Sequence, residues 1–296
     1  MTLNVPAPQP WVDSFDKEPM PDLGPEWPAA SRLLDRIRMG GVLVALAGVT
    51  AVGIPLQFLA LKLKLPARRR IPMLFHRAVL ALIGVRVTVK GEPSAARPLL
   101  FLSNHSTWLD ICVLGSVVPL VFVAKAEVAG WPLIGLLAKF QRSVFVDRQR
   151  RAKTGAVNQE IADRLSQGDP VVLFAEGTSS DGNRVLPFRS ALVGAVRDVM
   201  ATGADARVQP VSVAYVKVQG IPMGRQHRPL AAWYGDLDLA PHLLEVLRQG
   251  AIDVTVTFGQ AAALDGPLDR KAVTRLCEEE VKRLLQDSLT GRAGAT

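Results

Sequence analysis

The stretch LLFLSNHSTWLD, residues 99–110, predicts both the fold and a candidate site. Its apolar start is typical of a buried strand over 98–103, and the residues that follow favour a helix over 107–117. Asn104 and His105 fall between the two elements. Ligands bind at the carboxyl ends of strands in open α/β sheets. The stretch therefore indicates an α/β domain with a site beside His105.

His105 and Asp110 form the candidate catalytic pair. Residues five apart on one continuous helix point about 140° away from each other. The two side chains can meet only if His105 lies before the helix and folds back over its first turn. The carboxylate would then fix the imidazole tautomer and stabilise the imidazolium, as in a serine hydrolase triad, with a substrate hydroxyl in place of the serine.

Two plainer interpretations of these residues stay open. Thr107 and Asp110 have the spacing of a capping box, with Asp in place of the usual Glu. Asn104 and His105 would in that case only shape a turn.

A second polar segment follows another apolar strand. Residues 171–187 read VVLFAEGTSSDGNRVLP. Glu176, Gly177 and Thr178 stand at the carboxyl end of the predicted strand 171–175, and Gly177 permits close approach of the backbone to a ligand. An ordinary turn rich in small polar residues is the alternative.

The chain beyond residue 85 alternates short strands with amphipathic helices, which predicts one α/β domain over 85–290. The predicted strands are 85–90, 98–103, 120–125, 143–147, 171–175, 207–218 and 252–259, and they imply a mixed sheet of seven strands flanked by helices. The predicted helices are 107–117, 132–140, 150–167, 190–200, 241–250 and 269–288. In the last helix, the apolar stripe expected to face the core is Leu276, Val281, Leu284 and Leu285.

The region 31–84 predicts a membrane-associated helical segment. Residues 40–61 are 22 residues without a charge, and about 20 apolar residues suffice to span a bilayer as a helix. A second apolar stretch, 73–85, is too short to span and contains His76 and Arg77. The pair indicates either a helical hairpin or one span plus an interfacial helix. The alternative is a long helix buried in a soluble core.

The composition of the chain excludes several classes of protein. The 296 residues are 49% hydrophobic and 21% charged, which excludes a disordered chain. Two cysteines exclude a disulfide framework, and four histidines without metal-ligand spacing give no zinc site. Residues 1–30 are rich in proline and carry a net charge of −4, so they predict a disordered acidic tail. The remaining residues carry +12, which indicates an anionic partner such as a membrane, a nucleic acid or an acidic carrier.

Four ordered segments resemble the glycerolipid acyltransferase family, whose best-known members acylate 1-acyl-sn-glycerol-3-phosphate. The family pattern N-H-x-x-x-x-D matches Asn104, His105 and Asp110. The other three blocks match SVFVDR (143–148), which ends in Arg148, FAEGTSS (174–180) and VQPVSV (208–213). The resemblance covers residues 77–218.

The resemblance implies the glycerolipid acyltransferase fold with a membrane-attached N-terminal segment. It implies a fatty acyl thioester donor, on acyl carrier protein or coenzyme A, and a lyso-lipid acceptor with a free hydroxyl. His105 would be the general base and Asp110 its orienting partner, with no metal and no cofactor. Backbone N–H groups near the helix start at Thr107 would stabilise the oxyanion. The residues implied to contact substrates are Asn104, Arg148, Glu176, Gly177, Thr178 and Ser179, with Lys125 as a further candidate.

Two positions depart from the family pattern. Ala175 replaces a proline, and Ser179 replaces an arginine that is implicated in holding the acceptor's phosphate. A guanidinium binds phosphate through two charged donors, whereas a hydroxyl offers one neutral donor. Arg148, Arg184 or Arg189 would have to substitute, or the acceptor is not a phosphate monoester. The sequence resembles most the bacterial members that acylate lyso-ornithine lipid, an aminolipid without phosphate.

This resemblance places the protein at the bacterial inner membrane, with the catalytic domain in the cytoplasm. Two other classes are weaker interpretations of the sequence. A catalytically silent lipid-binding module would need neither His105 nor Asp110. Nucleic-acid binding would need aromatic platforms, and only 6% of the residues are aromatic.

Overall fold

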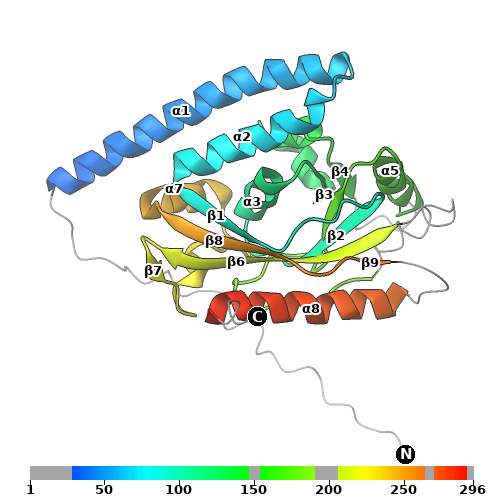
Figure 1. The fold of residues 1–296 in the computed structure, drawn as a ribbon. Helices are drawn as coiled ribbons and strands as arrows, with labels where there is room; N and C mark the ends of the chain where they lie inside the picture. Colours follow the sequence, from blue (N-terminus) through cyan, green and yellow to red (C-terminus); the bar gives the residue numbers. More distant parts are fainter. Residues whose placement is uncertain (1–28, 147–153, 191–205, 264–269, 292–296) are drawn as a thin grey trace, which may run out of the picture. The chain divides into compact units, whose positions relative to one another are not determined.

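The computed structural model describes residues 29–146, 154–190, 206–263 and 270–291. Contacts divide the chain into two units, residues 1–40 and 41–296. The described part of the first unit is the beginning of helix α1 (Ala29–Lys62). The description below concerns the second unit, whose helices and strands are labelled in Figure 1.

A mixed nine-stranded sheet lies at the centre of the second unit. Seven strands follow the order β1-β8-β6-β2-β5-β3-β4, and the short strands β7 and β9 pair with β6. β2 pairs in parallel with β5 and β6, and β3 pairs in parallel with β5 and β4. β8 runs antiparallel to β6 and parallel to β1. The carboxyl ends of β2, β3, β4, β5 and β6 therefore meet at one edge of the sheet.

The seven predicted strands lie where the sequence places them, with ends that differ by at most one residue. Their bounds are β1 Val85–Lys90, β2 Leu99–Ser103, β3 Val121–Lys125, β4 Val144–Val146, β5 Val171–Phe174, β6 Arg207–Val218, β7 Ile221–Pro222, β8 Ile252–Phe258 and β9 Ala262–Ala263. The predicted α/β class and mixed sheet are confirmed. β7 and β9 have only two residues each, too short for the alternating pattern that predicts a strand.

The helices also follow the prediction to within a few residues. They are α2 Ala67–Ile83, α3 Leu109–Val117, α4 Ile134–Phe140, α5 Thr154–Ser166, α7 Leu239–Gln249 and α8 Arg270–Thr290, with short 3-10 turns η2 at Ala126–Gly130 and η4 at Arg228–Leu230. The helix predicted over 190–200 lies outside the described residues, apart from its first residue.

Helix α8 covers one face of the sheet. Val273, Cys277, Val281 and Leu285 pack in the same buried cluster as Val208 of β6. The prediction that Leu276 faces the core is wrong, because 60% of this residue is exposed. The buried positions recur every four residues from 273, and position 276 falls one residue out of that stripe.

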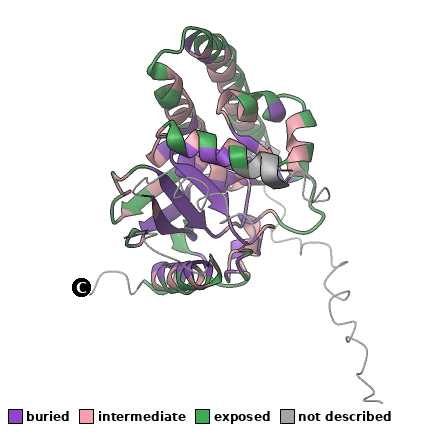
Figure 2. Cartoon of the chain, turned by 90° about the vertical axis from the view of Figure 1, so that its right-hand side faces the viewer, coloured by how far each residue is buried: buried purple, intermediate pink, exposed green. Residues whose placement is uncertain are grey.

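Helices α2 and α3 cover the opposite face of the sheet and pack against each other (Figure 1). His76, Leu80 and Ile83 of α2 are buried. The His76 Nε2 atom lies 2.9 Å from Oε1 of Gln141, which caps the carboxyl end of α4. Figure 2 shows the strands buried between these layers and the outward sides of the helices exposed.

Helix α1 is not a core helix, so that alternative is wrong. Over the 18-residue window whose hydropathy qualifies the helix to cross a membrane, only 6% of the residues are buried. Its inward side carries one buried polar residue, Gln57. The Gln57 Nε2 atom donates to the carbonyl of Arg68 at 3.0 Å and to the carbonyl of Phe140 at 2.8 Å. These bonds tie α1 to the start of α2 and to the end of α4.

A charged cluster lies at the amino ends of the strands. Asp169 precedes β5 and is 3% exposed. Its Oδ1 lies 2.7 Å from Nε of Arg69, and its Oδ2 lies 2.6 Å from Nη1 of Arg142. The carboxylate thus joins α2, the segment after α4 and the start of β5.

Candidate active site

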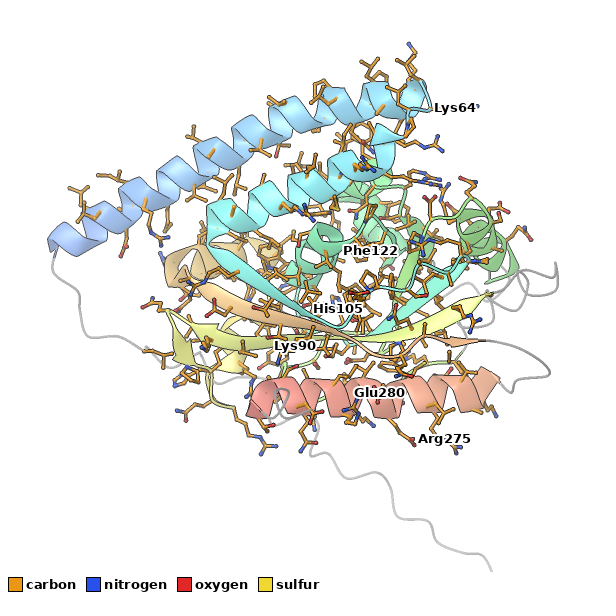
Figure 3. The ribbon with its side chains drawn as sticks, viewed as in Figure 1. Lys64, Lys90, His105, Phe122, Arg275 and Glu280 are labelled. Carbon is orange, nitrogen blue, oxygen red and sulfur yellow. The ribbon has the colours of Figure 1, made fainter. Side chains whose placement is uncertain are left out.

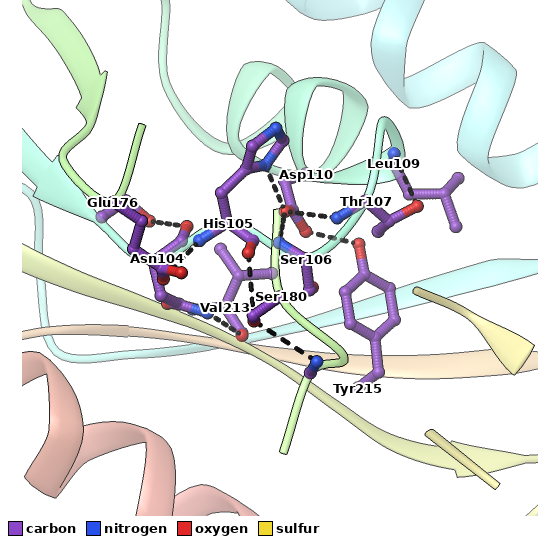
Figure 4. Close-up of polar contacts among 12 residues, drawn as sticks. Asn104, His105, Ser106, Thr107, Leu109, Asp110, Glu176, Ser180, Val213 and Tyr215 are labelled. Atoms are coloured by element: carbon purple, nitrogen blue, oxygen red, sulfur yellow. Dashed lines mark hydrogen bonds and ion pairs between the residues drawn. The ribbon is translucent and has the colours of Figure 1, made fainter. Parts of the chain in front are cut away.

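His105 lies at the carboxyl end of β2, in the segment between this strand and α3. Its Nδ1 atom is 2.9 Å from Oδ2 of Asp110, which belongs to the first turn of α3 (Figure 4). The imidazole therefore folds back over the helix start, as the spacing requires. Figure 3 shows His105 and Phe122 on the α3 side of the sheet and Glu280 on α8, on the other side.

Asp110 is fully buried and its two oxygens accept four hydrogen bonds. Besides His105, Oδ2 accepts from the backbone N–H groups of Ser106 at 2.7 Å and Thr107 at 3.0 Å. Oδ1 accepts from the Tyr215 hydroxyl at 2.8 Å. The carboxylate is held rigidly, and it selects the imidazole tautomer that carries its proton on Nδ1. The Nε2 atom is then left as a base.

The contacts of Asp110 agree with both interpretations of the sequence, the pair with His105 and the capping box with Thr107. The bond from the Thr107 N–H to Oδ2 is the side-chain half of a capping box. The same oxygen binds His105, so one carboxylate both caps the helix and orients the imidazole. The expectation that N–H groups at this helix start stabilise an oxyanion is wrong for Ser106 and Thr107, because both donate to Asp110.

The loop after β5 holds the backbone of His105 from both sides. Oε1 of Glu176 accepts the N–H of His105 at 3.0 Å, and the N–H of Ser180 donates to its carbonyl at 2.9 Å. Gly177 adopts a φ of +79° within the turn that brings Glu176 to this position. Glu176 is 2% exposed, and this burial raises the pKa of its carboxyl to about 8. The Glu176 carboxyl therefore keeps its proton to a higher pH than an exposed glutamate does.

Asn104 anchors the same segment to β6. Its Nδ2 donates to the carbonyl of Val213 at 3.0 Å, and its Oδ1 accepts the N–H of Val213 at 2.9 Å. The residue is 1% exposed. These contacts fix the start of the His105 segment, and a role of Asn104 in binding substrate stays a prediction.

Aromatic rings support the plane of the imidazole. The ring of His105 stacks on Phe174 with centroids 4.0 Å apart, and Phe174 stacks in turn near Phe122 at 6.0 Å. About 20% of the His105 side chain is exposed. One edge of a firmly supported ring thus reaches the surface of the site.

Sequence reasoning missed Tyr215, Phe174 and Ser180 as supports of the pair. Tyr215 lies two residues after Val213, the residue of β6 that bonds to Asn104. Their side chains point to the same side of the strand. This spacing is recognisable only once the contact between Val213 and Asn104 is known. The link to Asp110 spans 105 positions of the chain and has no local sequence pattern.

The residues predicted to bind substrate are placed unevenly. Thr178 is exposed and Ser179 is half-buried, on the loop that holds His105. Lys125 ends β3 and is exposed, as are Arg184 and Arg189. Arg148 lies outside the described residues. Within the described ranges, no three His, Cys, Asp or Glu side chains lie close enough to hold a metal ion together.

Comparisons with known proteins identify the family of this chain. A family model described as Acyltransferase matches residues 86–214. The lyso-ornithine lipid O-acyltransferase of Brucella abortus is 48% identical over 262 residues, which cover 88% of this chain and 98% of that protein. The chain belongs to the glycerolipid acyltransferase family. It is an acyltransferase, and the alternative of a catalytically silent module is set aside.

Other relatives of this acyltransferase are named for the same lipid or for 1-acyl-sn-glycerol-3-phosphate. The lyso-ornithine lipid O-acyltransferase of Rhizobium meliloti is 46% identical and covers 87% of this chain and 88% of that protein. The 1-acyl-sn-glycerol-3-phosphate acyltransferase of Neisseria meningitidis is 30% identical and covers 75% of this chain and 83% of that protein. The crystal structure of the 1-acyl-sn-glycerophosphate acyltransferase PlsC from Thermotoga maritima is similar with a TM-score of 0.56 and 21% identity, over 86% of this chain and 97% of that one. That likeness shows the shared fold.

Proposed function

We propose that this acyltransferase transfers a fatty acyl group from a thioester to the hydroxyl of lyso-ornithine lipid. The donor is acyl carrier protein or coenzyme A carrying the acyl chain. The observation that carries the chemistry is the 2.9 Å contact between His105 and Asp110 at the carboxyl ends of the strands. The two relatives with 46–48% identity support the acceptor.

In the proposed reaction, Nε2 of His105 takes the proton of the acceptor hydroxyl. The hydroxyl oxygen forms a bond to the thioester carbonyl carbon, and the carbonyl π electrons move to its oxygen. When the tetrahedral intermediate collapses, the C–S bond breaks. The imidazolium then returns its proton to the thiolate, so the products are an ester and a free thiol. No covalent acyl-enzyme is required.

Asp110 acts on this reaction through His105. Its buried carboxylate stabilises the imidazolium that forms as the hydroxyl loses its proton. Tyr215, Ser106 and Thr107 hold the carboxylate in place, so little reorganisation accompanies the proton transfer.

Ser179 favours a zwitterionic acceptor. A phosphate monoester carries close to two negative charges near neutral pH, and a hydroxyl in place of arginine compensates that charge poorly. Lyso-ornithine lipid has one carboxylate and one ammonium, so it requires no strong cationic fork. The Neisseria relative favours a second candidate acceptor, 1-acyl-sn-glycerol-3-phosphate.

The test of the acceptor compares kcat/KM for lyso-ornithine lipid and lysophosphatidate, each with acyl carrier protein and coenzyme A donors. We expect the wild type to prefer lyso-ornithine lipid. Ser179→Arg is expected to shift the ratio toward lysophosphatidate about tenfold, the value of one charge-assisted hydrogen bond. A wild type that prefers lysophosphatidate would overturn the proposed acceptor, and loss of that preference in Arg184→Ala would identify the arginine that binds phosphate.

Membrane attachment is the second part of the proposal. Helix α1 exposes apolar side chains along its outward side, among them Val44, Val52, Leu56 and Phe58. We expect the full chain to sediment with membranes and to require detergent for extraction, at the cytoplasmic side of the bacterial inner membrane. Deletion of residues 1–30 should leave this behaviour unchanged. A full-length protein that is monomeric in buffer without detergent would contradict it.

A further inference from the structure

The connection from η2 to α4 carries an exposed apolar surface. Residues 128–138 contain no charged side chain. Four large side chains of this stretch are exposed, and we call them the 131–136 patch: Trp131 is 36% exposed, Leu133 50%, Ile134 40% and Leu136 40%. Scattered exposed leucines are common on proteins, but contiguous exposed apolar residues mark interaction surfaces.

The backbone conformation at Leu133 and Gly135 keeps the side chains of the 131–136 patch exposed. A Cβ atom at Gly135 would lie 2.5 Å from the carbonyl oxygen of Ala129, so only glycine lets η2 close against α4. Leu133 adopts a φ of +59°, a region that branched side chains rarely enter. The tight closure buries Gly135 and leaves Leu133 and Ile134 exposed.

The patch is connected to the candidate active site. The rings of Trp131 and Trp233 meet edge to face with centroids 6.2 Å apart. The backbone N–H of Trp233 donates to the carbonyl of Ser106 at 2.7 Å, and Ser106 follows His105 directly in the sequence. In addition, η2 begins where β3 ends, so the patch lies at the same edge of the sheet as His105.

The patch is also connected to α1. Helix α4 starts within the patch and ends at Phe140, whose carbonyl accepts the hydrogen bond from Gln57. The neighbouring residues of α1, Phe58 and Leu59, are 55% and 49% exposed. One short helix thus joins α1, next to its exposed residues Phe58 and Leu59, to the apolar residues beside the site.

We propose that the 131–136 patch inserts into the membrane leaflet that α1 contacts, so that the entrance to the active site lies against the bilayer. The inference rests on the proposed function, in which the acceptor is a membrane lipid. A lipid leaflet fits better than a protein partner because the patch has no charge and continues the apolar side of α1. Tryptophan is also favoured at the boundary between lipid headgroups and acyl chains. An acceptor then presents its hydroxyl to His105 while its acyl chain stays in the leaflet.

The direct test measures insertion without activity. Full-length wild type and Trp131→Phe are reconstituted into vesicles with and without brominated lipids, which quench nearby tryptophans. We expect the fluorescence difference between the two proteins to be quenched strongly by brominated lipids, because that difference reports Trp131. A fluorescence difference that brominated lipids leave unquenched would overturn the proposal.

The second test separates lipid access from chemistry. Leu133→Gln combined with Ile134→Gln should lower kcat/KM about 10- to 100-fold for a long-chain acceptor in vesicles, because two apolar side chains no longer enter the leaflet. A short-chain acceptor dissolved as monomers should be used normally. The matched control combines Leu276→Gln with Ile221→Gln, which are 60% and 69% exposed elsewhere, and it should change neither rate.

Each remaining outcome has a definite meaning. An equal loss of kcat/KM for both acceptors would show that the patch supports the fold, and it would overturn the proposal. A raised KM for acyl carrier protein alone would mark a protein-binding surface, and it would overturn the proposal as well. If lyso-ornithine lipid is not acylated at all, the proposed acceptor fails. Quenching of Trp131 still decides membrane insertion in that case, so the two failures are distinguishable.

Discussion

Two buried aspartates at opposite ends of the strands are held in different ways. Asp169, at the amino ends, faces the guanidinium groups of Arg69 and Arg142. Asp110, at the carboxyl ends, faces one imidazole, one hydroxyl and two backbone N–H groups. Two cations neutralise the first charge and fasten elements together. Only dipoles surround the second charge, so a proton arriving on His105 still experiences its attraction. The comparison separates a carboxylate that joins elements from the carboxylate that we propose for the chemistry.

The largest expected effects fall on the site at the carboxyl ends. His105→Ala should lower kcat about 10²- to 10⁴-fold, the usual range for loss of a general base. Asp110→Asn should have a comparable effect, because the amide can no longer stabilise the imidazolium. Steady-state assays with the preferred acceptor measure both.

The control for the histidine is His227→Ala, at a half-buried position of a surface loop. It should keep normal activity. His105→Ala should still unfold cooperatively on heating, because the other three hydrogen bonds to Asp110 remain. Near-normal turnover of His105→Ala or Asp110→Asn would remove the proposed mechanism.

The opposite outcome is expected at the amino ends. Asp169→Asn leaves the Arg69 and Arg142 guanidinium groups facing each other without a carboxylate, which should lower the free energy of unfolding by about 1–3 kcal/mol. The lower part of that range applies if solvent screens Arg69, whose side chain is 41% exposed. Denaturant unfolding measures the loss, and kcat per folded molecule should be unchanged. A fall in kcat with normal stability would break the comparison between the two aspartates.

The sequence predicts the site's location well for a physical reason. The apolar strand 99–103 and the polar residues after it are local features, and the geometry of parallel strands then places His105 at the ligand-binding edge. The spacing from His105 to Asp110 also restricts the backbone enough to predict its fold-back. Helix α8 shows the limit of this reasoning, because Leu276 is apolar but lies out of phase with the buried stripe.

Contacts between distant segments are where sequence reasoning fails. Tyr215 reaches Asp110 only because β6 pairs with β2, and no local pattern encodes that pairing. Gln57 illustrates the same point in α1: it is a polar interruption of an apolar run, yet its partner Phe140 lies 83 positions away. The sequence also predicts that N–H groups near the helix start at Thr107 stabilise an oxyanion, and only the structure shows that Asp110 accepts the hydrogen bonds of Ser106 and Thr107.

Glu176 extends the comparison to a third buried carboxyl, which has neither cations nor four donors. Burial raises its pKa to about 8, so the folded protein keeps a proton that the unfolded chain releases above pH 4.5. Stability from this group is therefore present below pH 4.5 and falls as the pH rises toward 8, by at most about 1.4 kcal/mol per pH unit. Glu176→Gln keeps an oxygen for the His105 N–H and removes the titration.

The measurement for Glu176 is the free energy of unfolding of both proteins between pH 5 and 8. Other groups titrate in the same range, so the difference between the two proteins isolates Glu176. We expect that difference to shift by about 3–4 kcal/mol in favour of Glu176→Gln as the pH rises. A constant difference across the range would mean that the Glu176 carboxyl is already ionised at pH 5 in the folded protein.

The smallest expected effect concerns Tyr215, the one donor on Oδ1 of Asp110 among the hydrogen bonds of the described residues. Burial and the nearby Asp110 charge raise the pKa of Tyr215 well above its usual value, so the hydroxyl stays a neutral donor throughout the working pH range. Tyr215→Phe removes this bond and concentrates the carboxylate charge on the side of His105. The imidazolium should then be stabilised before substrate binds, so the acid limb of the kcat/KM profile should move to higher pH. We expect kcat/KM near neutral pH to fall about tenfold, in line with the loss of one hydrogen bond to a charged group.

The chain's other tyrosine supplies the control, since Tyr234 is 37% exposed and Tyr234→Phe leaves Asp110 untouched. Identical pH profiles for the two variants would show that Tyr215 only packs against the site, and Asp110 would then owe its role to His105, Ser106 and Thr107 alone.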